Sequence, residues 1–220
     1  MTRKSVILFA ILLIGLVSAC SSGSSDPTPS DDKSSAASGS NSEAATAQFE
    51  SCSGLLDLNE VQDASGRGDV EMGEPNPNSG PAASNGLGIK AMCIYEYLTP
   101  EIPVGGPAQV RISGPAMTLT GILFDSVESA GVHYRSSLEG IRALRDAADP
   151  DSDVSEGVAG DESYLLTVDS QGVGSVVAVQ VGPYFISFHT TLPDGQSPLL
   201  VPEDLVSLAE TVQERLDSNQ

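Results

Sequence analysis

Residues 175–190, SVVAVQVGPYFISFHT, contain two β-strand patterns that are separated by two turn-forming residues. Strands are predicted at Ser175–Val181 and Tyr184–Thr190, because both runs are rich in β-branched or aromatic residues. Gly182-Pro183 provides the tight link between them. Parallel neighbours would need a crossover of roughly a dozen residues or more, so strands joined this closely are antiparallel. The stretch therefore predicts a hairpin in an antiparallel sheet.

The same strand pattern, bordered by Gly or Pro, recurs on the amino-terminal side of the hairpin. These further strands are predicted at Lys90–Leu98, Ala108–Ser113, Met117–Phe124 and Tyr164–Val168. Two other stretches carry turn and loop signals. Gly66–Gly88 is predicted to be a long loop, and the acidic stretch Asp149–Asp153 a turn.

Helices are predicted where capping signals precede apolar residues that recur every three or four positions. A capping-box pattern at Asp57–Glu60 starts a short helix that Gly66 ends. A long helix extends from Asp125, its predicted cap, to about Ala148. A closing helix extends from Glu203 to about Leu216, with Pro202 in its first turn. The predicted fold class is α+β, an antiparallel sheet of about six strands with flanking helices, in the order helix, three strands, helix, three strands, helix.

The two longer helices each carry an apolar stripe that is predicted to pack inward. On the long helix the stripe comprises Val127, Ala130, Tyr134, Leu138, Ile141, Leu144 and Ala148. On the closing helix it comprises Leu205, Leu208, Ala209, Val212 and Leu216.

The amino terminus has the layout of a bacterial lipoprotein signal. Two basic residues in Met1–Lys4 precede an apolar run at Val6–Leu16, and small residues lead to the cysteine in Val17–Cys20. We expect residues 1–19 to be a signal peptide, with cleavage before Cys20 and lipid on its thiol. The alternative is an ordinary secretory signal with an incidental cysteine. The lipoprotein interpretation predicts a protein anchored to the cell membrane on its extracytoplasmic face.

Two further segments follow the signal peptide. Residues 20–47 comprise the lipidated cysteine and a Ser/Ala/Gly-rich tether with almost no large apolar side chain, so we expect this segment to be disordered. As a flexible coil it would span roughly 30 Å. Residues 48–220 contain enough Val, Ile and Leu for one core and are predicted to form a single globular domain.

The charge of the chain restricts its partners. The chain has thirty acidic and ten basic residues, which gives a net charge of −20. This charge repels phosphate backbones, so nucleic acid is not an expected partner. The expected partners are the membrane, through the lipid on Cys20, and an unknown envelope protein or small ligand.

The three cysteines divide into one for lipid and two others. With Cys20 lipidated, Cys52 and Cys93 remain, and an even remainder in an exported protein favours a disulfide. Two free buried thiols are the alternative. A metal site would need more ligands than this pair offers.

Residues suited to catalysis or metal binding are few. His133 and His189 are the two candidate bases of a hydrolase, yet neither lies in a diagnostic motif, and no Gly-x-Ser-x-Gly elbow surrounds any serine. Asp149, Asp151 and Asp153 begin like a calcium loop, but the residues that should complete the pattern differ. No cofactor is expected, and the calcium site is a weak candidate.

Several motifs together resemble a known family. They are the lipobox Val17–Cys20, Cys52-x-x-Leu55-Leu56 before a short helix, Cys93 on a strand, Gly160-Asp161-Glu162 ahead of a strand, and a closing helix rich in Leu and Val. The chain resembles the actinobacterial lipoproteins that share domain of unknown function 3558, and more loosely the extracellular sensor domains of actinobacterial receptor kinases. The resemblance implies an antiparallel sheet flanked by helices, a disulfide between Cys52 and Cys93, and no established activity.

The sequence thus favours a non-enzymatic, membrane-tethered module that binds a protein or a small ligand in the cell envelope. An envelope hydrolase is the alternative. It would require His133 or His189 to meet a serine and an acid in the folded protein.

Overall fold

The computed structural model describes residues 54–74, 88–104, 110–148, 152–160, 162–168, 174–191 and 196–218. The predicted signal peptide 1–19, the tether 20–47, Cys20 and Cys52 lie outside these ranges, so their assignments stay predictions. The single domain predicted for residues 48–220 stays a prediction as well. No helix in the described part of the chain is long and apolar enough to cross a membrane.

Seven strands form one antiparallel sheet in the order β1-β2-β5-β9-β8-β7-β6. The strands are β1 (Glu71–Met72), β2 (Ile89–Leu98), β5 (Ala116–Phe124), β6 (Asp153–Glu156), β7 (Ser163–Thr167), β8 (Val176–Val181) and β9 (Tyr184–Thr191). The hairpin predicted from residues 175–190 is β8–β9, in which Val181 pairs with Tyr184 across the Gly182-Pro183 turn. The predicted α+β class with an antiparallel sheet is confirmed.

Three details of the predicted strands differ. The strand expected at Ala108–Ser113 is β4 (Val110–Ile112), which pairs with β3 (Ile102–Val104) in a separate two-stranded sheet. β1 lies inside the stretch predicted as a loop, and β6 begins at Asp153, where a turn was predicted. Neither β1 nor β6 has an apolar alternation, and each is positioned by backbone pairing with a strand that does, β2 and β7 respectively.

The helices are α2 (Leu58–Ser65), α3 (Val127–Ala148) and α4 (Pro202–Asp217). The capping box of α2 is present, and Gly66 ends that helix in the left-handed region, as predicted. The residue that caps α3 is Ser126, one position after the predicted Asp125. Ser126 Oγ accepts a hydrogen bond from the Ser129 N–H at 3.1 Å, while Asp125 accepts one from the Ser129 hydroxyl.

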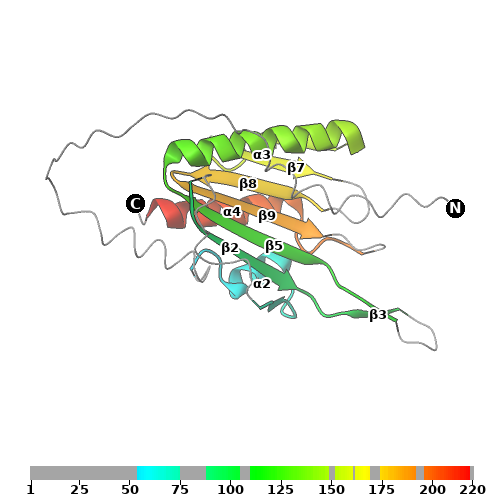
Figure 1. Cartoon of the computed structure of the whole chain (residues 1–220). Coiled ribbons are helices and arrows are strands. Elements are labelled where there is room, and N and C mark those ends of the chain that lie inside the picture. Colours follow the sequence, from blue (N-terminus) through cyan, green and yellow to red (C-terminus); the bar gives the residue numbers. More distant parts are fainter. Residues whose placement is uncertain are drawn as a thin grey trace, which may run out of the picture. The chain divides into compact units, whose positions relative to one another are not determined.

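The two faces of the sheet are covered by different helices (Figure 1). α4 and α2 pack on one face, over a core that includes Ile186 and Phe188 of β9. α3 packs on the other face, where Phe185 of the same strand contributes to a second core. All five predicted inward residues of α4 are buried. On α3, Ala130, Tyr134, Leu138 and Ile141 are buried, as predicted, and Leu144 is half-buried. The prediction is wrong for Val127, which is 58% exposed at the first residue of the helix, and the side chain of Ala148 lies outside the described part.

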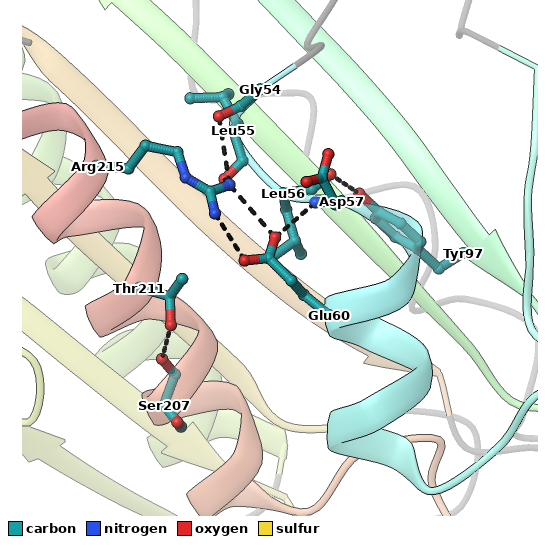
Figure 2. Close-up of polar contacts among 9 residues, drawn as sticks. All are labelled: Gly54, Leu55, Leu56, Asp57, Glu60, Tyr97, Ser207, Thr211 and Arg215. Carbon is teal, nitrogen blue, oxygen red and sulfur yellow. Dashed lines mark hydrogen bonds and ion pairs between the residues drawn. The ribbon is translucent and has the colours of Figure 1, made fainter.

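A polar cluster joins the first described residues to α4 (Figure 2). Arg215 of α4 donates hydrogen bonds to the carbonyl oxygens of Gly54 and Leu55 and to both carboxylate oxygens of Glu60 on α2. Next to this group, the Tyr97 hydroxyl on β2 donates to the Leu56 carbonyl at 2.9 Å. The cluster therefore holds the start of the described chain against both α4 and the sheet.

Replacing Tyr97 by Phe is expected to lower the free energy of unfolding by about 1–2 kcal/mol. Tyr97 is 1% exposed, so the substitution leaves the Leu56 carbonyl buried without its donor. Urea unfolding of the wild type and of Tyr97→Phe measures the difference. Tyr95→Phe is the matched control, because Tyr95 is only half-buried on the same strand. Equal losses in the two variants would contradict the role of the Tyr97 bond.

Candidate binding face

Polar side chains gather on the face of the sheet that carries α3. Thr118 and Thr120 on β5, and Ser187 and His189 on β9, are half-buried, and Glu96 on β2 is exposed. They lie on the same face as Ile122 and Phe185, which pack beneath α3, because alternate residues of a strand share a face. We call these five residues the polar sheet face.

The strand register places these residues side by side. Glu96 pairs with Thr118, and Thr118 pairs with His189, so the three form one row across β2, β5 and β9. Thr120 pairs with Ser187 in the row beside it. Neighbouring strands lie about 4.8 Å apart, so each row offers polar groups at regular short spacing. α3 packs against β5, β8 and β9, where Ile122 and Phe185 belong to the core beneath it (Figure 1).

The hydroxyl groups of this face are available for hydrogen bonding. Within the described ranges, the side chains of Thr118, Thr120 and Ser187 form no hydrogen bond with the protein. A hydroxyl both donates and accepts, and a half-buried hydroxyl without a protein partner must bond to water or to a ligand. The polar sheet face therefore suits a neutral polar ligand or a polar protein surface.

Apolar side chains border the polar sheet face at β2. Leu98 is 39% exposed and is two residues from Glu96, and half-buried Ile94 is the next residue on that face in the other direction. Contact area from these two side chains would add to hydrogen bonds from the neighbouring rows. A mixed surface of this kind is typical of binding sites.

The structure does not bring the predicted catalytic groups together. The ring centroid of His133 on α3 lies 5.2 Å from that of Phe124 and 4.6 Å from that of Phe185, and no hydrogen bond or ion pair joins His133 to an acid among the described residues. His189 shares a row with Thr118 and Glu96, but among the described residues no hydrogen bond joins His189 to a hydroxyl or a carboxylate. A hydrolase base needs such bonds to be oriented and to activate a nucleophile.

Burial keeps both imidazoles neutral. It lowers the pKa of His133 and of His189 below the ordinary value of 6.5. At neutral pH each ring therefore has one N–H donor and one acceptor nitrogen. On the polar sheet face, this makes His189 a neutral hydrogen-bonding group alongside the hydroxyls.

The lowered pKa values predict how stability depends on pH. Below pH 6.5 the unfolded state binds more protons at the two histidines than the folded state does. Their contribution to the free energy of unfolding is therefore fully present above pH 6.5 and is lost as the pH falls through their lower pKa values in the folded protein. We expect the free energy of unfolding to fall on acidification from pH 7 to pH 5. Urea unfolding at both pH values should show a smaller fall in His133→Phe and in His189→Gln. An unchanged fall in the double variant would contradict the assignment.

The predicted metal ligands are only partly described. Asp149 and Asp151 lie outside the described residues, and Asp153 on β6 accepts a hydrogen bond from Ser155 at 3.1 Å. In the described ranges, no three His, Cys, Asp or Glu residues are grouped as metal ligands. Cys93, the predicted partner of Cys52, is buried on β2 and disulfide-bonded. Its pairing with Cys52 stays a prediction.

Comparison with solved structures shows a structural likeness to an extracellular domain. The extracellular domain of PknH from Mycobacterium tuberculosis matches with a TM-score of 0.54 and 10% sequence identity, over 79% of this chain and 96% of that chain. The two share a fold. This agrees with the looser resemblance to extracellular sensor domains. No protein-family model and no curated protein matches the chain, so membership of the family with domain of unknown function 3558 stays a prediction.

Sequence reasoning singled out His189 but missed the hydroxyl residues around it. Their signal is the alternation of Thr118 and Thr120 with apolar residues in one predicted strand, and of Ser187 with apolar residues in another. Each alternation predicts a polar face. That the two faces adjoin depends on the pairing of β5 with β9, which are separated in the chain by α3 and three strands.

Proposed function

We propose that the protein is an extracytoplasmic lipoprotein, anchored through Cys20, whose polar sheet face binds an envelope protein or a small polar ligand without catalysis. The observation that supports it is the group of half-buried hydroxyls in two adjacent rows, which form no hydrogen bond with another described residue and have neutral His189 beside them. Groups of this type at regular spacing favour recognition by hydrogen bonds. The shared fold with an extracellular domain is consistent with a place outside the cytoplasm.

The arrangement gives less support to the hydrolase alternative. Hydrolysis by a serine or threonine would require a base hydrogen-bonded to the nucleophile, and a third group that orients the base. His133 instead contacts two phenylalanines. His189 lies near hydroxyls but has no hydrogen bond to one among the described residues.

A photo-crosslinking residue in place of Thr118 tests the binding role in the full chain, expressed in its own envelope. The same residue at Glu210, exposed on α4, is the matched control because α4 covers the opposite face of the sheet. We expect a defined adduct at position 118 that is absent at position 210. The adduct should also weaken when Thr120→Lys places a long charged side chain next to the site. Identical adducts at both positions, or none at position 118, would refute the binding role.

Two further variants separate the remaining parts of the proposal. Cys20→Ser should release the protein from the membrane fraction and abolish incorporation of labelled palmitate. A variant that stays membrane-bound would exclude the lipid anchor. The double variant His133→Ala, His189→Gln keeps a neutral hydrogen-bonding side chain at position 189 and should still capture the crosslinking partner, in the same chemical form as the wild type does. Accumulation of an uncleaved partner that the wild type cleaves would favour the hydrolase.

A further inference from the structure

The outer face of α3 is exposed along most of its length. Val127 and Glu128 are exposed in its first turn, and beyond that turn the exposed residues are Val132, Arg135, Ser136, Glu139, Gly140, Arg142, Ala143 and Asp146. Val132 is 56% exposed, which is unusual for a β-branched apolar residue in the middle of a helix. The helix has 22 residues and is about 33 Å long, and the stretch from Val132 to Asp146 is about 21 Å of it.

This helix differs in charge from the rest of the protein. The chain carries −20 overall, whereas α3 balances three arginines against Glu128, Glu139 and Asp146. Two copies of so acidic a protein repel each other over most surfaces. The α3 face is one on which they can approach without that repulsion.

The charges on α3 also have an order that complements itself. Arg135, Glu139, Arg142 and Asp146 are spaced by four, three and four residues, so they form one stripe along the helix. Their signs alternate from plus to minus. When the stripe is read backwards the signs are reversed, so two antiparallel copies place opposite charges together. Two parallel copies in register would place like charges together.

We propose that two copies of the protein pair through the exposed face of α3, with the helices antiparallel. Arg135 lies opposite the partner's Asp146, and Glu139 lies opposite the partner's Arg142. The two-fold symmetry repeats both pairs. The crossing point then lies between Gly140 and Ile141.

The contacts already present within the chain leave room for these pairs. Arg145 donates two hydrogen bonds to Asp146, and both end on Oδ1, which leaves Oδ2 for the partner's Arg135. Arg142 uses one terminal nitrogen for Glu156, and a guanidinium has five N–H donors.

Crosslinking with a short bismaleimide tests both the pairing and its direction in the full chain in its own envelope. Ala143→Cys lies beside the charged stripe on the exposed face, its two copies are separated by five helical positions, about 7.5 Å along the helix, and it is expected to crosslink to its copy in the partner. Val132→Cys is the matched control. In the antiparallel pair its two copies are separated by 17 helical positions, about 25 Å, and should not crosslink. Crosslinking at both positions would overturn the antiparallel arrangement, and crosslinking at neither would overturn the dimer.

Charge exchange tests the predicted pairs independently. Arg135→Asp and Asp146→Arg each place like charges opposite one another twice per dimer, and each should raise the dimer dissociation constant about tenfold. The double variant should restore the wild-type value. Arg67→Asp makes the same charge change on a half-buried residue next to α2, outside the face of α3, and should have little effect. Sedimentation of the full chain in detergent measures these constants. A double variant as weak as the single ones, or an equal effect of Arg67→Asp, would overturn the pairing.

Discussion

Replacing Phe188 by Ala is expected to lower the free energy of unfolding by about 3–5 kcal/mol, the largest effect of any substitution considered. Phe188 is 0% exposed and lies on β9, between β5 and β8, where it belongs to the core beneath α4 and α2. Truncation removes the transfer energy of the ring and leaves a cavity, because central strands on both sides prevent the site from collapsing. Urea unfolding monitored by circular dichroism measures the loss.

The control for this prediction is Val132→Ala, which truncates an apolar side chain that is 56% exposed on α3. It should change the free energy of unfolding by no more than about 0.5 kcal/mol. A loss below about 1 kcal/mol for Phe188→Ala would mean that the core under α4 is not packed as described.

Replacing Arg215 by Met is expected to cost about 2–3 kcal/mol. The side chains of Arg215 and Glu60 are 30% and 28% exposed, and Nη2 of Arg215 lies 2.6 Å from Oε1 of Glu60. The substitution also removes the donor of the Leu55 carbonyl, which accepts from Arg215 at 2.8 Å. Met keeps much of the aliphatic packing of the side chain, so the loss reports chiefly on the polar contacts. Chemical denaturation at pH 7 measures it.

The same pair predicts a dependence on acid. Burial would raise the pKa of Glu60, but hydrogen bonds from Arg215 and from the Asp57 N–H outweigh it, so the pKa lies below the ordinary 4.5. The contribution of Glu60 to the free energy of unfolding is therefore fully present above pH 4.5. It is lost as the pH falls through the lower pKa that Glu60 has in the folded protein. Arg215→Met should lose less stability than the wild type on acidification across this range. Parallel losses in both proteins would show that the Arg215–Glu60 pair does not cause the shift.

The order of residues along the chain was sufficient for most elements of the fold. The alternation in residues 175–190 and the Gly182-Pro183 turn predict β8–β9, and the capping box at Asp57–Glu60 predicts the start of α2. These features depend on backbone preferences and on side-chain periods within a few residues. β1 and β6 escaped prediction because they have two and four residues, too few for a period, and form by pairing with a neighbour.

The tertiary structure alone decided which residues adjoin across the sheet and between its helices. β5 lies between β2 and β9, and this order turns the separate polar faces of three strands into one polar sheet face around His189. Arg215 meets Glu60 across 155 positions of the chain. No local pattern encodes such a contact, because it forms only when the burial of two apolar faces brings distant helices together on the same side of the sheet.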